Sequence, residues 1–188
     1  MQRPITSHQK KLSALCAIVG AQSTSKELES IEVSGISQAS DSVLPGDLFI
    51  ALPGEKVHGA QFASDAISKG AVAVLTDAIG AKEIKGVPVL VSTNPRRAAG
   101  IASAWFYSEP MRDLYSVGVT GTNGKTTVTT LLHQIMTAAG RDSGLIGTVE
   151  TRIGVESIAS KRTTPESSDL QALSAVMRER HMRNLIME

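Results

Sequence analysis

The sequence predicts an α/β fold in two parts, a small N-terminal α/β domain over residues 1–113 and the first part of a parallel-sheet domain over residues 114–188. Two observations support this prediction. Apolar runs rich in β-branched residues alternate along the chain with segments of helical periodicity. Aromatic residues make up only 3% of the 188 residues, so Ala, Val, Leu and Ile must build the core. Such a core suits helices that cover β-branched strands.

The first domain is expected to alternate strands and helices. A helix is predicted over residues 12–21, and another starts at Pro95, which suits the first turn of a helix. Apolar residues at helical spacing over 62–67 predict a third helix, which Gly70 ends. Alternation or turn-flanked apolar runs predict strands over residues 31–36, 47–52, 71–75 and 87–91.

The second domain opens with a strand, a loop and a helix in direct succession. Residues 115–120 form the predicted strand, and a glycine-rich loop follows it. Apolar residues then recur at i, i+3, i+4, i+7, i+8 and i+11 from Val128 to Ala139, which is one face of a helix. The pattern breaks at Ser108-Glu109-Pro110, which places the domain boundary near Asp113.

Charge and cysteine content exclude several classes of function. The net charge is +1, from 19 basic and 18 acidic residues without a long run of one sign, so we expect neither nucleic-acid binding nor membrane binding. The apolar stretch 12–21 is too short to span a bilayer. Cys16 is the only cysteine and the histidines lack metal-ligand spacing. The composition therefore predicts a reducing, cytoplasmic setting.

The loop after the strand reads GVTGTNGKTT over residues 118–127 and carries the chemistry. Gly121 and Gly124 allow positive φ angles, which bring backbone N–H groups within reach of phosphate oxygens. Lys125 supplies a charge for the β- and γ-phosphates, and the Thr126 hydroxyl is placed to ligate Mg²⁺. The residues expected to bind a nucleoside triphosphate are Gly121, Thr122, Asn123, Gly124, Lys125, Thr126 and Thr127.

This loop departs from the general phosphate-loop pattern, G-x-x-x-x-G-K-[ST]. The pattern places its first glycine at Val119, whereas the nearest glycines here are Gly118 and Gly121. The alternative is a glycine-rich turn that precedes a lysine by chance. The coincidence of strand, glycines, Lys-Thr-Thr and amphipathic helix favours the phosphate loop. A dinucleotide site is disfavoured because G-x-G-x-x-G is absent.

The variant loop resembles that of the Mur ligases, bacterial enzymes that assemble the peptide stem of peptidoglycan. The segments VLPGDLFIAL at 43–52 and LIGTV at 145–149 are similar to segments of the same family. TTPE at 163–166 and Met-Glu at 187–188 resemble the MurE branch, which adds the third amino acid to UDP-N-acetylmuramoyl-L-alanyl-D-glutamate. The resemblance spans the chain from about residue 31 to residue 188.

The resemblance implies an ATP-dependent amide-bond ligase. ATP would phosphorylate the terminal carboxylate of the UDP-MurNAc-dipeptide, and the amine of a diamino acid, meso-diaminopimelate or lysine, would attack the acyl phosphate. Lys125 and Glu188 would be the catalytic residues, with Thr126 and Glu188 as Mg²⁺ ligands. Thr163 and Thr164 would contact the muramoyl-peptide. Helix capping is the alternative for these two threonines, and an ordinary charge at a strand end is the alternative for Glu188.

The resemblance also assigns the two domains. Residues 1–113 would bind the UDP-muramoyl substrate, and residues 114–188 would be the N-terminal part of a truncated P-loop ATPase domain. The family has Asp-Ser-Arg ahead of its Pro-Gly-Asp segment, where this chain has Ala39-Ser40-Asp41. Ser40 retains the hydroxyl that would meet uracil, while the flanking charges are lost or inverted.

Family members are far longer than 188 residues. The sequence therefore predicts a fragment with little ligase activity alone and with an exposed sheet edge and apolar surface in its second domain. Competing interpretations are a MurF or folyl-polyglutamate ligase, a stand-alone nucleotide-binding switch, or a non-catalytic substrate-binding module of residues 1–113. A guanine-specific Asn-Lys-x-Asp motif is absent, which counts against a GTPase. The sequence does not define an oligomeric state.

Overall fold

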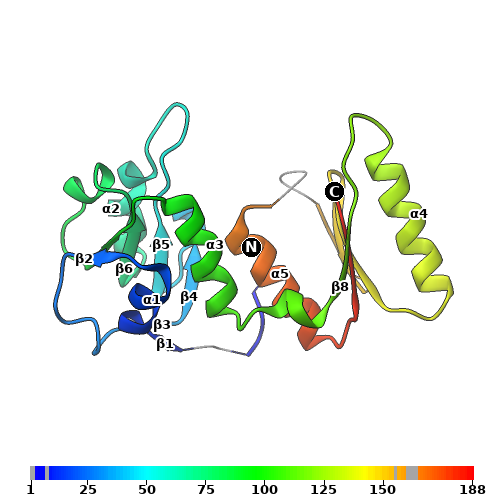
Figure 1. The fold of residues 1–188 in the computed structure, drawn as a ribbon, viewed down its shortest axis with the longest axis horizontal. Coiled ribbons are helices and arrows are strands. Elements are labelled where there is room, and N and C mark those ends of the chain that lie inside the picture. Colours follow the sequence, from blue (N-terminus) through cyan, green and yellow to red (C-terminus); the bar gives the residue numbers. More distant parts are fainter. Residues whose placement is uncertain (1–2, 7–8, 155, 160–164) are drawn as a thin grey trace. The chain divides into compact units, whose positions relative to one another are not determined.

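The computed structural model describes residues 3–6, 9–154, 156–159 and 165–188. The chain divides into two compact units, with the main division between Ser108 and Glu109 and with residues 3–5 grouped with the second unit (Figure 1). The 3-10 helix η4, Pro110–Asp113, packs against helix α5 of the second unit, so the second unit begins ahead of Asp113. Of the helices described, none combines the length and the apolar character needed to cross a membrane.

The first unit is built around a mostly parallel sheet with strand order β2-β7-β6-β5-β4. Strands β4 to β7 run parallel, and β2 joins β7 antiparallel. A separate antiparallel pair, β1 with β3, completes the strands described there. The bounds are β1 Lys10–Lys11, β2 Gln22–Ser23, β3 Glu32–Val33, β4 Gly35–Ser37, β5 Asp47–Ile50, β6 Ala73–Thr76 and β7 Val89–Val91. A strand is found at each of the four predicted positions, but the predicted strand 31–36 is divided between β3 and β4, which belong to different sheets, and β6 ends one residue later than expected.

The 3-10 helices and α2 connect the parallel strands, whereas α1 precedes β2 and α3 follows β7. The bounds of these helices are α1 Leu12–Val19, η1 Ser40–Ser42, η2 Gly59–Phe62, α2 Ala63–Ser68, η3 Gly80–Lys82 and α3 Pro95–Phe106. Helix α3 begins as expected, with Pro95 in its first turn and the Asn94 side chain accepting the N–H of Arg97 at 3.1 Å. The predicted helices of this unit are confirmed.

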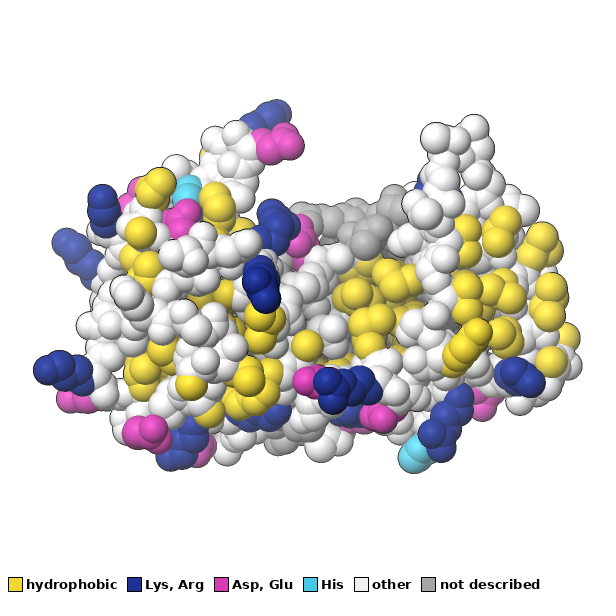
Figure 2. Space-filling view, in the orientation of Figure 1, with side chains coloured by type: hydrophobic (Ala, Val, Ile, Leu, Met, Phe, Trp, Pro, Cys, Tyr) yellow, Lys and Arg dark blue, Asp and Glu magenta, His cyan; other side chains and the backbone are white. Residues whose placement is uncertain are grey.

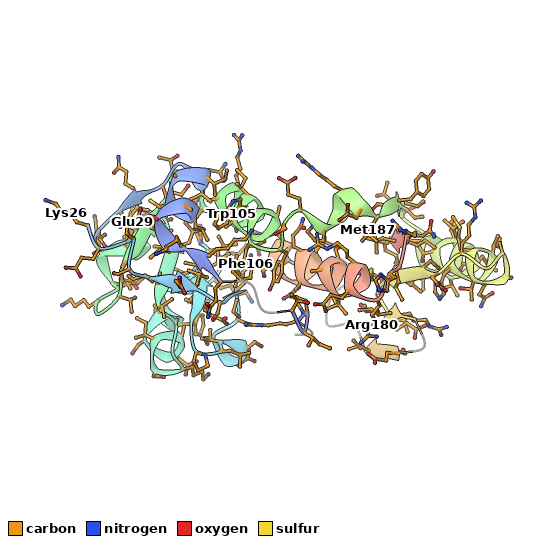
Figure 3. All side chains as sticks on the ribbon, turned by 90° about the horizontal axis from the view of Figure 1, so that it is seen from below. Lys26, Glu29, Trp105, Phe106, Arg180 and Met187 are labelled. Carbon is orange, nitrogen blue, oxygen red and sulfur yellow. The ribbon has the colours of Figure 1, made fainter. Side chains whose placement is uncertain are left out.

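Small aliphatic side chains fill most of the core of the first unit. One cluster is mainly Ala, Val and Ile and includes a single aromatic residue: Val43, Phe49, Ala51, Ala60, Ala63, Ala66, Ala71, Val74, Ile84 and Val89. The end of α3 supplies further aromatic packing (Figure 3), where Phe106 meets Tyr107 edge to face at 5.0 Å. The ammonium of Lys10 lies 4.4 Å from the centre of the Trp105 ring, a cation–π contact.

The second unit has a mixed sheet with strand order β11-β10-β9-β12-β8. Strands β9, β12 and β8 are parallel, whereas β10 and β11 form an antiparallel hairpin on β9. The bounds are β8 Tyr115–Gly118, β9 Ser143–Ile146, β10 Glu150–Ile153, β11 Glu156–Ala159 and β12 Asn184–Met187. The sequence predicted a parallel sheet, and the hairpin makes it mixed.

The two faces of this sheet are covered in different ways. Helix α5, Ser167–Glu179, and η4 cover one face and enclose an apolar core. That core consists of Leu114, Ile146, Ile153, Leu173, Val176, Met177, Met182 and Leu185. Helix α4, Lys125–Ala138, packs on β9 and β12. Its existence was predicted from the periodicity after the loop.

Helix α4 leaves much of its apolar stripe exposed, although Leu132 and Met136 are half-buried. Its buried residues are Thr129 and His133, whereas Val128, Leu131 and Ile135 are 50%, 52% and 64% exposed. Figure 2 shows hydrophobic side chains gathered over this helix. Strand β8 lies at the edge of the described sheet, and its Tyr115 is 68% exposed. The expected sheet edge and apolar surface are therefore found at β8 and α4.

Candidate functional site

Three parallel strands of the second unit end at the same level. Met187, the last residue of β12, pairs with Gly118 at the end of β8 and with Ile146 at the end of β9. The backbone N–H of Glu188 continues this ladder by donating to the carbonyl of Ile146 at 3.0 Å. In open α/β sheets, ligands bind outside the carboxyl ends of the parallel strands, so a ligand site is expected at this edge.

The glycine-rich loop leaves β8 at this edge and leads into α4. Gly124 precedes the helix with φ of 79°, a left-handed conformation that glycine adopts without steric cost. Its carbonyl accepts the N–H of Val128 at 2.9 Å, which starts the helical ladder. Residues 121–124 are exposed, and the first N–H groups of α4 have no carbonyl partner within the helix. A helix start of this kind attracts anions.

Lys125 and Thr126, the first two residues of α4, direct polar groups to different partners. The Lys125 ammonium folds back over the loop and donates to the carbonyl of Gly121 at 2.8 Å. The Thr126 hydroxyl donates to Oε2 of Glu188 at 3.2 Å. The predicted site residues Lys125, Thr126 and Glu188 are thus brought together at the carboxyl edge of the sheet, although Glu188 lies far from the loop in sequence.

Thr148 is a fourth residue of this site, and sequence reasoning did not assign it a role. It follows the end of β9 and donates twice to the Glu188 carboxylate. Its N–H donates to Oε1 at 3.1 Å and its hydroxyl donates to Oε2 at 2.9 Å. The only signal for it in the sequence is its place in the LIGTV segment at 145–149.

The carboxylate of Glu188 is held in its charged form. Burial acts to raise the pKa of Glu188, but the bonds donated by Thr148 and Thr126 and the charge of Lys125 outweigh it, and the pKa is lowered. An ionised carboxylate beside a threonine hydroxyl is a pair of hard oxygen donors, which suits a cation such as Mg²⁺. Within the described ranges no group of three or more His, Cys, Asp or Glu side chains could hold a metal by itself. A cation here would need oxygens from a ligand such as a phosphate chain.

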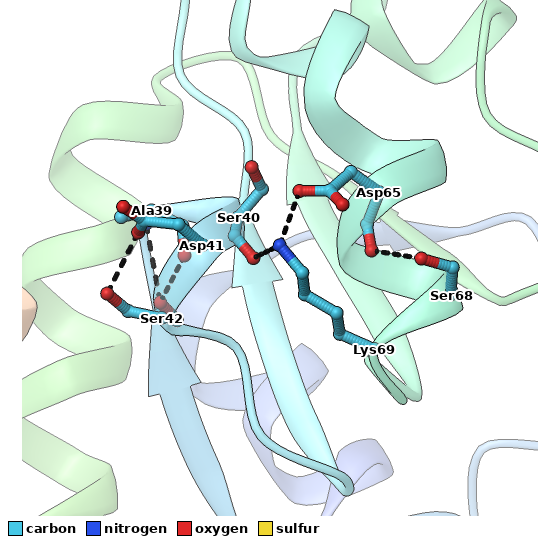
Figure 4. Close-up of polar contacts among 8 residues, drawn as sticks. Ala39, Ser40, Asp41, Ser42, Asp65, Ser68 and Lys69 are labelled. Carbon is cyan, nitrogen blue, oxygen red and sulfur yellow. Dashed lines mark hydrogen bonds and ion pairs between the residues drawn. The ribbon is translucent and has the colours of Figure 1, made fainter.

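Ser40, the residue expected to meet uracil, lies in the first unit at the start of η1 (Figure 4). Its carbonyl accepts the Lys69 ammonium at 3.0 Å, and the same ammonium pairs with Asp65 at 2.8 Å. The side chain of Ser40 is itself a partner of Asp65, which helps to lower the pKa of that carboxyl after the larger contribution of Lys69. Asp65 of α2 and Lys69, which follows this helix, therefore hold the segment that carries Ser40.

Other predicted residues are placed less specifically. Thr122, Asn123 and Thr127 lie in the exposed part of the loop and the first turn of α4. Thr163 and Thr164, expected to contact a muramoyl-peptide, fall outside the described residues. Helix α5 begins after them at Ser167, without a side-chain hydrogen bond at its cap residue.

A strand, a glycine-rich loop and a helix at the carboxyl edge of parallel strands, with Lys-Thr at the helix start, define the phosphate-loop class of nucleotide-binding proteins. Comparison with known families narrows this class. The Mur ligase middle domain matches residues 119–188, and the domain described as "Mur ligase family, catalytic domain" matches residues 32–107. The chain belongs to the Mur ligase family.

Curated relatives agree with this assignment. The chain is 48% identical, over 99% of its length, to the UDP-N-acetylmuramoyl-L-alanyl-D-glutamate--2,6-diaminopimelate ligase of Streptomyces avermitilis, and covers 36% of that protein. It is 42% identical, again over 99% of its length, to the UDP-N-acetylmuramyl-tripeptide synthetase of Leifsonia xyli, and also covers 36% of that protein. The chain thus spans about a third of the length of these relatives.

Solved structures show the same fold. A UDP-N-acetylmuramoyl-L-alanyl-D-glutamate--2,6-diaminopimelate ligase matches with a TM-score of 0.72 at 22% identity, over 96% of this chain and 36% of the other. MurF from Acinetobacter baumannii matches with a TM-score of 0.66 at 18% identity, over 98% of this chain and 36% of the other. MurF from Thermotoga maritima, in complex with ADP, matches with a TM-score of 0.53 at 18% identity, over 81% of this chain and 31% of the other.

Proposed function

We propose that the second unit binds ATP with Mg²⁺ and that Lys125, Thr126 and Glu188 carry this function. The observation that supports it best is the convergence of the three residues at the ends of β8 and β12. Backbone N–H groups from Gly121 to Thr127 would bind the phosphate oxygens, with the Thr122 and Asn123 backbone in the middle of the loop. When the nucleotide binds, the Lys125 ammonium would give up its hydrogen bond to the Gly121 carbonyl and pair with the phosphates, because these carry a full negative charge.

Mg²⁺ would be held by the Thr126 hydroxyl and the Glu188 carboxylate. When bound, it would supply positive charge to the phosphate chain. The residues fit this part because Glu188 is ionised and within hydrogen-bond distance of Thr126. Phosphoryl transfer needs positioning and charge neutralisation more than covalent chemistry by the protein, and a loop, a lysine and a fixed carboxylate provide these.

The reaction we propose is ligation of a diamino acid to UDP-MurNAc-L-Ala-D-Glu through an acyl phosphate. Both curated relatives described above are named for reactions on this pathway intermediate or its tripeptide product, one of them with 2,6-diaminopimelate. We therefore favour meso-diaminopimelate over lysine, and this branch over MurF or folyl-polyglutamate ligases. The chain would contribute the nucleotide loop and part of the substrate site to this activity, in the bacterial cytoplasm.

The first domain, residues 1–113 by sequence, is proposed to anchor the UDP-muramoyl end of the substrate. Ser40 would meet the uracil, in a segment whose position Lys69 and Asp65 maintain. Thr163 and Thr164 would hydrogen-bond the peptide part. Ser40→Ala should weaken UDP-substrate affinity without changing ATP affinity, because the hydroxyl belongs to the unit that lacks the phosphate loop.

One substitution tests the nucleotide site. Lys125→Ala removes a charge-assisted contact of about 1.5–3 kcal/mol, so ATP affinity should fall about ten- to a hundredfold. Lys82→Ala, at the end of η3 in the first unit, is the matched control and should keep wild-type affinity. Calorimetric titration with a non-hydrolysable ATP analogue measures both. An unchanged affinity for Lys125→Ala would remove this lysine from the site, and a preference for guanine would favour a nucleotide-binding switch.

A further inference from the structure

In the turn that joins β9 to β10, the backbone lies so close to the Glu188 side chain that no Cβ atom fits between them. This turn starts at Gly147, whose N–H donates to the carbonyl of Glu150 at 3.0 Å. A Cβ atom added to Gly147 would lie 2.6 Å from Oε1 of Glu188, far inside van der Waals contact. Glycine at this position therefore lets the carboxylate reach the backbone of the turn.

Thr148 holds both oxygens of the same carboxylate. The backbone N–H binds Oε1 at 3.1 Å, and the hydroxyl binds Oε2 at 2.9 Å. Two donors from one residue fix the plane of the carboxylate as well as its position, because each oxygen has its own partner. A single donor would leave the carboxylate free to rotate about its last bond.

The same carboxylate also meets the start of α4. Oε2 accepts the Thr126 hydroxyl at 3.2 Å in addition to that of Thr148. The Glu188 side chain thus spans two segments, the turn after β9 and the first turn of α4. Its orientation toward Thr126 depends on the turn, since Thr148 contributes two of the three described bonds.

We propose that Gly147 and Thr148 form a carboxylate cradle, which positions Glu188 and thereby sets the strength of Mg²⁺ binding beside the nucleotide. This inference rests on the proposed function of Thr126 and Glu188. Thr148 is a positioning residue in this arrangement, acting on the cation through Glu188. Residues that orient a metal ligand commonly change metal affinity by ten- to a hundredfold when they are replaced.

Two variants disturb the cradle in independent ways. Thr148→Val removes the hydroxyl donor and keeps the N–H and the shape of the side chain. Gly147→Ala adds the Cβ atom that would displace Oε1, and because the clashing atom ends a flexible side chain, the backbone of the turn can stay in place. Thr148→Ser keeps both donors and should keep the wild-type Mg²⁺ requirement. Thr130→Val in α4 and Gly100→Ala in α3 are matched controls for the two kinds of change.

The experiment titrates the purified 188-residue chain with a fluorescent ADP analogue, with EDTA present and then over a series of Mg²⁺ concentrations. In Thr148→Val and Gly147→Ala, the Mg²⁺ concentration at half-maximal effect should rise about tenfold. Affinity in EDTA should stay at the wild-type value. Thr148→Ser and both controls should match the wild type throughout.

The outcomes separate this inference from the function on which it rests. If Glu188→Gln raises the Mg²⁺ requirement while both cradle variants leave it unchanged, the cradle has no such role and the metal site stands. An equal loss of affinity with and without Mg²⁺ in the cradle variants would show a general structural defect and also overturn the inference. If wild-type affinity does not depend on Mg²⁺, both the cradle and the proposed metal site are wrong.

Discussion

The hydroxyl of Thr126 donates to the carboxylate of Glu188 at 3.2 Å, which joins the start of α4 to the residue that follows β12. This bond links the phosphate loop to Glu188, a residue that no sequence pattern near the loop predicts as its neighbour. Both residues lie at the carboxyl edge of parallel strands, where a phosphate chain would meet the start of α4.

Replacing Thr126 should separate the role of its hydroxyl from its role in the helix. Thr126→Val removes the donor to Glu188 and a cation ligand, so we expect the Mg²⁺ requirement for nucleotide binding to rise about tenfold, in line with a bond to a charged group of about 1.5–3 kcal/mol. Thr126→Ser should behave like the wild type. Fluorescence titration at several Mg²⁺ concentrations measures the change. A normal Mg²⁺ requirement in Thr126→Val would contradict the assignment.

The buried His133 should make the second unit sensitive to acid. Its ring bonds Ser143 at 2.9 Å, and burial lowers the pKa of His133, with Arg152 adding to the effect and Glu150 opposing it. A histidine with a lowered pKa binds fewer protons in the folded state than in the unfolded state. Its contribution to stability is therefore complete above its ordinary pKa of 6.5 and falls as the pH drops below that value.

Amide hydrogen exchange of α4 and β9 at pH 7 and pH 5.5 tests this prediction. After correction for the intrinsic exchange rate, protection should fall in the wild type as the pH drops, and it should fall less in His133→Gln. His181→Gln removes an exposed histidine and should keep the wild-type pH dependence. Identical losses of protection in the wild type and in His133→Gln would show that the buried imidazole does not cause the sensitivity.

The exposed stripe of α4 should tolerate polar substitutions. Leu131→Gln and Ile135→Gln replace side chains that are more than half exposed, so the free energy of unfolding should change by no more than about 0.5 kcal/mol. Leu145→Ala empties a buried position of β9 and should cost about 2–5 kcal/mol. The polar variants should also self-associate less, as measured by sedimentation velocity, because they reduce the area of an exposed apolar patch. A large destabilisation by Ile135→Gln would place this side chain in a core.

Two glycines of the first unit should respond to alanine in opposite directions. Gly100 lies inside α3 with no atom within 4 Å of an added Cβ, so Gly100→Ala should stabilise by about 0.5–1 kcal/mol. At Gly59 the added Cβ would lie 2.8 Å from the backbone nitrogen of Leu52, so Gly59→Ala should destabilise by about 1–3 kcal/mol. Urea unfolding followed by Trp105 fluorescence reports on this unit. Changes of the same sign would contradict the packing described here.

The sequence predicted most of the helices and strands because their signals are local. Pro95 at the start of α3 and Gly124 before α4 act within one turn of chain. Periodicity identified α4 as amphipathic, but it could not show which face the sheet covers. Thr129 can face the sheet because its hydroxyl bonds the Lys125 carbonyl at 3.0 Å within the helix, and His133 can do so because it meets Ser143 of β9.

Sequence reasoning missed the β10–β11 hairpin and the role of Thr148. Strands β10 and β11 turn at Gly154, with φ of 64°, and this glycine and the alternation of charged and uncharged residues in Glu150-Thr151-Arg152-Ile153 were available signals. The only signal for Thr148 was its place in the LIGTV segment, because its contact with Glu188 depends on β9 lying beside β12. The proximity of Glu188 to Thr126 was expected only from the family resemblance.

Strands β9, β12 and β8 end side by side at the same edge of the sheet, and this register affects the order of folding. A slip of β12 by one residue against its neighbours would shift Glu188 by about 3.3 Å and turn its side chain to the opposite face of the sheet. Strand β8, the loop and α4 are contiguous in sequence and can form locally. The Glu188 carboxylate, however, reaches Thr126 only when β12 has inserted between β9 and β8 in the correct register. Metal-assisted nucleotide binding should therefore appear late in refolding and report on the insertion of this central strand.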